Sequence, residues 1–156
     1  SFDEVFRGEY AAVVRVLAPI VGIEDAESVA QEAFLKAFTR WRRVGSYDRP
    51  GAWIRRVAIR DAVRFAERNR RHHPLPGPPR ELADGAADRV DLQEALRCLS
   101  ARQRASVVLH HLAGHPVGEV AVFLGCSEAT VRVHLHRARA ALTVLLQPDP
   151  EVTNGP

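Results

Sequence analysis

The chain lacks what several classes of protein require. Its 156 residues include no methionine, so the translation start is not expected within this stretch, and the only cysteines, Cys98 and Cys126, cannot form a disulfide framework. No apolar run approaches the ~20 residues of a membrane-spanning helix, and no charged-then-apolar segment at the N-terminus indicates a secretion signal. These absences argue against an integral membrane protein, and we expect no membrane insertion. They also make the reducing cytoplasm the expected compartment.

Lysine is almost absent as well, because 21 of the 22 basic residues are arginine. The planar guanidinium group matches the oxygens of phosphate. The net charge is −4 over residues 1–39, +8 over 40–71, −3 over 72–96, +4 over 97–147 and −2 in the remaining tail. Two basic blocks separated by an acidic one predict a polyanion that is contacted at two places.

The apolar pattern is helical throughout. Apolar residues recur every three or four positions over 2–17, 25–41 and 51–69, and again over 90–99, 105–112, 117–124 and 128–146. Pro19 and Gly22 are expected to end the first helix. Phe34, Phe38, Trp41 and Trp53 lie on apolar stripes and are expected to face the core.

Residues 72–88 interrupt this pattern with four prolines and two glycines. The sequence therefore predicts an all-α protein with two small helical domains, residues 1–71 and 90–147. A proline-rich extended linker, residues 72–89, joins them, and residues 148–156 form a tail. Each domain has only about 60–70 residues, so each should be marginally stable alone and should need support from a partner.

Residues 117–131 have the pattern of a helix-turn-helix motif. Ala121 is small where two helices cross, Gly125 supplies the positive φ of the tight turn, and Ser127 caps the second helix. Positions that project outward from the second helix are predicted to meet duplex DNA: Ser127, Glu128, Ala129, Arg132, Val133, His136, Arg137 and Arg139. Two alternatives stay open: an ordinary helical hairpin, and a phosphate rather than a guanine contact for Arg132.

Three segments in this order resemble bacterial extracytoplasmic-function (ECF, group IV) RNA polymerase sigma factors. They are Asp25–Phe34, Trp53–Ala58 and Leu124–Arg139, and the resemblance covers nearly all of residues 2–146. It implies sigma region 2 in the first domain and sigma region 4 in the second. It also implies an alternative sigma factor that binds core RNA polymerase, recognises the −10 and −35 promoter elements, and helps to open the promoter.

The resemblance also implies which residues bind. The acidic helix would dock on the clamp helices of the largest polymerase subunit through Asp25, Glu27, Gln31 and Glu32, although these residues could also simply favour a helix N-terminus. The flap of the polymerase would be a second contact. Single-stranded −10 DNA would be held by Arg42, Arg43, Tyr47, Arg49, Arg55, Arg56 and Arg60. The loop 45–50 would accept an extruded base.

Two positions depart from the family. Arg60 and Arg64 stand where relatives usually carry Asn and Asp, which puts the −10 preference in doubt. Many relatives have an anti-sigma factor, and the sequence leaves open whether this chain has one.

Other function classes find less support. His111 and His115 are four residues apart, as in a zinc helix, but the HExxH order is absent and no cysteine pair has zinc-finger spacing. No catalytic residue, metal site or cofactor is therefore expected. The alternative that remains is a stand-alone helix-turn-helix regulator, which would bind duplex operator DNA without polymerase.

Overall fold

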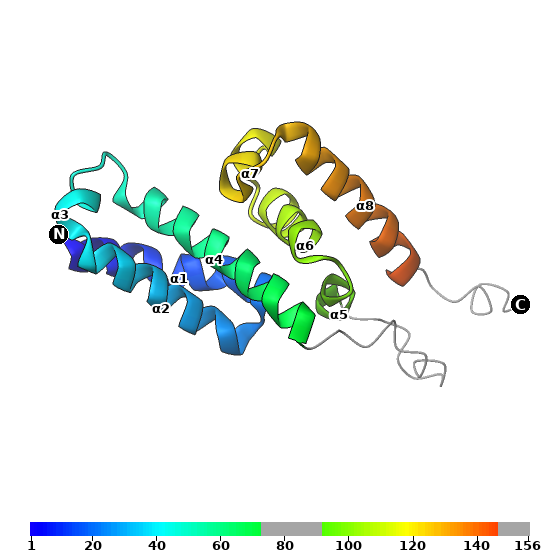
Figure 1. Ribbon diagram of the computed structural model, residues 1–156, viewed down its shortest axis with the longest axis horizontal. Helices are drawn as coiled ribbons and strands as arrows, with labels where there is room; N and C mark the ends of the chain where they lie inside the picture. The colour runs from blue at the N-terminus through cyan, green and yellow to red at the C-terminus, as the bar shows by residue number, and fades with distance from the viewer. Residues whose placement is uncertain (73–91, 147–156) are drawn as a thin grey trace, which may run out of the picture.

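In the computed structural model the described part of the chain, residues 1–72 and 92–146, is helical and contains no strand (Figure 1). Most of the predicted linker and all of the tail lie outside the described residues, as do the side chains of residues 70–72. The elements are α1 (Phe2–Val21), α2 (Ile23–Thr39), α3 (Trp41–Val44), α4 (Pro50–His72), α5 (Leu92–Arg97), α6 (Ala101–Val107), the π-helix η1 (Val108–Leu112), α7 (Val117–Leu124) and α8 (Glu128–Leu146). The all-α prediction is confirmed.

α1 begins with a capping box, because the Ser1 hydroxyl accepts from the Glu4 amide and the Glu4 side chain reaches back to Ser1. The expected end at Pro19 is wrong: the helix continues through the proline to Val21. Proline lacks an amide hydrogen and so removes one hydrogen bond. Placed in the last turn, it leaves the helix intact until Gly22, where φ is +96°.

Aromatic rings join α1, α2 and α3 at the N-terminal end. Phe2 packs edge-on against Phe38 and Trp41, with ring centroids 5.2 and 5.4 Å apart, and Phe6 packs against Phe34 at 5.1 Å. Phe34 is buried as expected, whereas Phe38 is 59% exposed. Phe38 therefore places only one side of its ring against this cluster.

The second half of the described chain is built around α6 and α8. The Ser100 hydroxyl accepts from the Gln103 amide and so caps α6. Where the sequence predicts a continuous helix, the backbone widens into η1, and the Ala113 amide reaches back to the Val108 carbonyl at 2.9 Å. Gly114, with φ +77°, follows this turn.

The two halves, residues 1–72 and 92–146, pack directly on one another. α4 contacts both α6 and α7, and α1 contacts α6 and η1, so the buried apolar residues of both halves form one cluster. Figure 1 shows α4 between the α1–α2 pair and the α6–α7 pair. Each half thus receives from the other some of the support that its small size predicts it needs.

Candidate nucleic-acid and protein interfaces

α7 and α8 form the predicted helix-turn-helix. α7 ends at Leu124, Gly125 takes the left-handed conformation with φ +67°, and the Ser127 hydroxyl accepts from the Thr130 amide at 3.1 Å. Val120 and Val131 are fully buried between the helices. The turn and the cap were each predicted from the sequence and are confirmed.

One face of α8 is open to solvent. Every residue that the sequence assigns to DNA contact there is exposed: Ser127, Glu128, Ala129, Arg132, Val133, His136, Arg137 and Arg139. Arg132 donates to Glu128 at 3.4 Å, one helical turn away. The carboxylate of Glu128 also lies over Gly118 of α7, 2.9 Å from the place that a Cβ would take. An exposed helix with cationic and apolar side chains has the shape and chemistry to enter a major groove.

The predicted single-strand residues fall into two groups. Arg42, Arg43, Tyr47 and Arg49 are exposed on α3 and on the loop that follows it, at the end of the molecule opposite α8 (Figure 1). That loop starts tightly, because a Cβ on Gly45 would lie 2.8 Å from the Trp41 indole. Trp41 and Trp53 are half-buried against the core, as expected.

The other group lies on α4. Arg55 is half-buried and donates to Glu9 at 2.7 Å. An exposed stripe with one arginine per turn runs along the helix: Arg56, Arg60, Arg64 and Arg68. Such a row of cations can follow a phosphate backbone.

Arg60 is directed to the second half of the chain rather than away from the protein. Its guanidinium donates to the carbonyls of Phe123 (3.3 Å) and Val122 (3.1 Å). These carbonyls lie in the last turn of α7, and the Val122 carbonyl also accepts from the Gly125 amide at 3.3 Å.

The acidic face of α2 carries more than the predicted polar residues. Glu27, Gln31 and Glu32 are exposed, whereas Asp25 is partly covered. Leu35 is 60% exposed and, with Phe38, extends this face with apolar surface. The sequence analysis missed Leu35. Its spacing could have identified it, because a residue four positions after Gln31 lies on the same face of the helix as Gln31, and Leu35 is not part of the apolar stripe.

Arg104 is a buried residue that the sequence analysis also missed. It is 9% exposed, and its guanidinium donates to Leu96, Arg97 and Leu99 in the second half and to Ile20 at the end of α1, the last at 2.7 Å. The spacing could have shown it, because Arg104 lies three residues after Ala101 and four before Val108, on a buried stripe.

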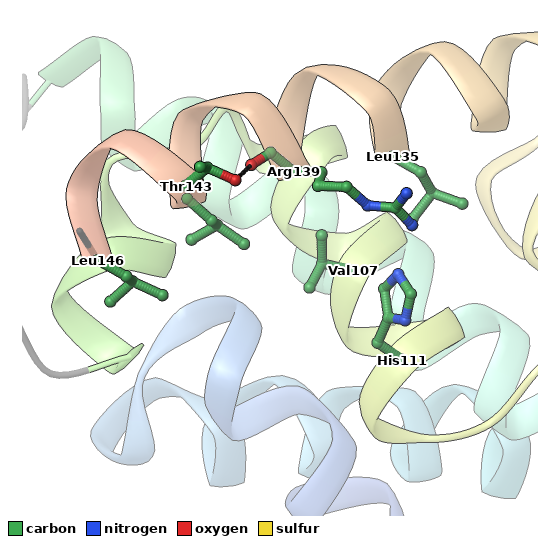
Figure 2. Close-up of a pocket in the computed structure, with 7 residues that line it drawn as sticks. Val107, His111, Leu135, Arg139, Thr143 and Leu146 are labelled. Atoms are coloured by element: carbon green, nitrogen blue, oxygen red, sulfur yellow. Dashed lines mark hydrogen bonds between the residues drawn. The ribbon is translucent and has the colours of Figure 1, made fainter.

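A groove of about 350 Å³ runs between α6, η1 and α8. Figure 2 shows apolar side chains along it, with His111 and Arg139 at one end. Partial burial, together with His110 and Arg139, lowers the pKa of His111. Burial, Arg102 and Arg137 lower that of His134. Within the described ranges, no His, Cys, Asp or Glu side chains gather in a group that could hold a metal ion, and no helix there is long and apolar enough to cross a membrane.

Comparison with known proteins shows the family to which the chain belongs. The models of sigma-70 region 2 and sigma-70 region 4 match residues 5–72 and 89–142, which defines the class as sigma-70-type proteins. The RNA polymerase sigma-E factor of Streptomyces antibioticus is 32% identical over 149 residues, 91% of this chain and 82% of that protein. The ECF RNA polymerase sigma factor SigM of Mycobacterium tuberculosis is 33% identical over 158 residues, 94% of this chain and 77% of that protein. The chain belongs to the ECF family of RNA polymerase sigma factors.

A solved structure supports the fold. The sigma factor RpoE in complex with the anti-sigma factor NepR, from Bartonella quintana, matches with a TM-score of 0.65 and 23% identity, over 93% of this chain and 96% of that one.

Proposed function

We propose that this chain recruits core RNA polymerase to promoters and sets where transcription begins. The observation that carries the proposal is the separation of two unlike surfaces, an acidic and apolar face on α2 and an exposed reading face on α8. The chain itself supplies no catalytic group, since the chemistry of RNA synthesis belongs to the polymerase. It acts in the cytoplasm, where the polymerase works.

The α2 face is the proposed polymerase contact. Exposed Leu35 and Phe38 provide apolar area, and Glu27 and Glu32 beside them provide charge that steers a basic partner. Large apolar side chains in the open, rimmed by polar ones, are typical of protein interfaces. The face is part of one helix with a buried opposite side, so it is held rigidly before binding.

The two basic surfaces are the proposed promoter contacts. α8 reads the −35 element as duplex DNA, with Arg132 and its neighbours at base edges and Arg137 and Arg139 on phosphates. The exposed arginines of α3 and the following loop, together with Tyr47, hold the unpaired −10 strand. Their distribution over both halves explains why two basic blocks occur along the sequence.

Charge reversal on α2 tests the polymerase contact. The variant Glu27→Lys/Glu32→Lys should weaken binding to purified core polymerase by at least tenfold, because two attractive charges become repulsive. The matched control Asp3→Lys/Glu94→Lys makes the same charge change at exposed acids on α1 and α5 and should bind normally. Equal affinity of the two variants in titration would refute the assignment.

Transcription distinguishes this function from the alternative of a stand-alone regulator. Run-off transcription from a genomic library should yield defined start sites only when both the chain and core polymerase are present. A regulator would instead bind its duplex operator tightly by itself and leave the start sites of core polymerase undefined.

A further inference from the structure

Glu9 of α1 contacts α4 at two positions near the start of that helix. Its Oε2 accepts from Arg55 Nη2 at 2.7 Å, with the two side chains 30% and 32% exposed. The Glu9 side chain also packs on Gly51, where Cγ and Cδ lie 3.0 Å from the place that a Cβ would take. A carboxylate beside the first turn of a helix interacts favourably with the helix dipole. Glu9 therefore fastens the start of α4 to α1 by charge and by contact.

The start of α4 in turn fixes the α3–α4 loop, residues 45–49. The carbonyl of Arg49, the last residue of this loop, accepts from the Ala52 amide of α4 at 3.1 Å. At the other end, the Tyr47 amide donates to the Val44 carbonyl of α3 at 3.1 Å. Because both ends of the loop are bonded to helices, a displacement of the first turn of α4 moves the exposed side chains of Tyr47 and Arg49.

We propose that Glu9 is a positioning residue for promoter opening. It holds the first turn of α4, and through it the α3–α4 loop, in the arrangement that binds the unpaired −10 strand. Arg55 then serves as the partner of Glu9 and not as a contact to DNA, although the sequence pattern groups it with the DNA-binding arginines. The inference rests on the proposed function, because it concerns how that loop holds the strand.

The surroundings of Arg55 differ from those of the other arginines on α4. Arg56 and Arg64 are exposed, and no residue in the ranges 1–72 and 92–146 forms a hydrogen bond with either guanidinium group. Arg55 is half-buried and already donates to a carboxylate, and such charge-assisted hydrogen bonds are among the strong ones. A phosphate drawn to Arg55 would also approach Glu9, and like charges repel. Arg55 is therefore suited to holding α1 and α4 together, whereas exposed arginines are suited to binding phosphate.

Gly51 is the residue that makes room for Glu9. It lies within α4 and is not among the glycines with positive φ, so the backbone conformation does not require a glycine there. Glycine is a poorer helix former than alanine, and local helix propensity alone would favour alanine at this position. The close approach of the Glu9 side chain explains why the position is occupied by glycine.

Hydrogen exchange in the free, full-length chain tests the positioning without polymerase. Glu9→Gln and Arg55→Gln should each speed exchange of the Ala52 amide roughly threefold to tenfold, the effect of one net hydrogen bond. The double variant should be no faster than either single variant, because both changes remove the same bond. Arg7→Gln removes the same charge at an exposed position of α1 and should leave exchange unchanged. Unchanged exchange in the two single variants, or additive effects in the double variant, would overturn the positioning.

Promoter opening by the holoenzyme gives a readout that a general loss of stability would not reproduce. The probe is a promoter recovered by run-off transcription, and the permanganate reactivity of its −10 thymines measures opening. Glu9→Gln and Arg55→Gln should both lower opening about threefold to tenfold, while binding to the −35 duplex stays unchanged.

A direct phosphate contact by Arg55 predicts the opposite sign for one of these variants. Glu9→Gln would then release Arg55 and increase opening. Arg55→Gln would also lower the slope of log affinity against log salt by about 0.7, the value for one phosphate of a single strand. Either result would overturn the proposal.

A variant without a charge change makes the test independent of electrostatics. Gly51→Ala should displace Glu9 and so speed exchange and lower opening, while circular dichroism shows a folded protein. Normal exchange in this variant would contradict the contact, and fast exchange with full opening would contradict the positioning role. If the chain formed no holoenzyme, the proposed function would fail, whereas hydrogen exchange would still decide whether Glu9 holds the loop.

Discussion

The turn of the helix-turn-helix offers a quantitative test, because its glycine has a calculable role. Gly125 has φ +67°, a conformation that costs an L-residue about 1–2 kcal/mol. An added Cβ would meet nothing closer than Arg60 Nη2 at 3.8 Å, an ordinary contact, so the cost of Gly125→Ala comes from the backbone alone. We expect the free energy of unfolding to fall by about 1–2 kcal/mol and Tm by roughly 2–8 °C.

Other glycines supply matched controls. Gly8 lies exposed in α1, with nothing within 4 Å of an added Cβ. Because alanine is the better helix former, Gly8→Ala should stabilise the protein by about 0.5–1 kcal/mol. Gly114, with φ +77° and open space around it, should respond as Gly125 does but without a change in DNA binding. Gly125→Asn should recover part of the loss, since asparagine tolerates the left-handed region.

Chemical denaturation of these variants measures all the effects on one scale. Duplex binding by each folded variant then separates loss of stability from loss of the reading geometry. The cost of Gly125→Ala would not come from the backbone conformation if Gly125→Ala and Gly8→Ala changed stability in the same direction. The same would follow if Gly125→Asn were no more stable than Gly125→Ala.

Three further predictions concern α8. Arg132→Ala should relax preference at the −35 element by about 1–3 kcal/mol if the side chain makes a bidentate base contact; a uniform loss on all sequences in binding titrations would make it a phosphate contact. Gly118→Ala should push the flexible Glu128 carboxylate aside and so release Arg132 from its hydrogen bond to Glu128. We expect the preference for −35 sequences in a duplex selection to change while Tm is not lowered. An unchanged preference would refute this coupling. The pKa of His134 is lowered in the folded chain, so below about pH 6.5 the unfolded chain binds more protons than the folded chain. The contribution of His134 to the free energy of unfolding is therefore fully present above about pH 6.5 and is lost as the pH falls below it. His134→Gln should therefore flatten the loss of stability between pH 7 and pH 5 in denaturation series, and an unaltered slope would contradict the assignment.

Much of the local structure could be predicted from the sequence. The bounds 117–124 and 128–146 were predicted correctly because Gly125 and Ser127 mark the turn between two apolar stripes. Pro19 misled the prediction because a proline disrupts a helix interior more than its last turn. Phe38 was placed inside because periodicity identifies a stripe but not how far neighbouring helices cover it.

The packing of the two halves was beyond the sequence pattern. It depends on arginines that meet backbone carbonyls, such as Arg60 with Val122, and every residue carries such a carbonyl, so no residue type identifies the partner. The roles of individual residues in polymerase and promoter binding stay predictions. For the residues on α2, α3, α4 and α8 that were assigned to binding, the structure shows how exposed they are and how they are arranged.

The placement of the two tryptophans has a practical consequence for any study of unfolding. Trp41 of α3 and Trp53 of α4 are the only indoles in the chain, and both pack against the core. Intrinsic fluorescence therefore reports directly on the surroundings of α3 and α4, whereas far-ultraviolet circular dichroism reports on every helix. Superimposable melting curves from the two signals would show a single cooperative transition, and curves that diverge would give the temperature at which one half melts without the other.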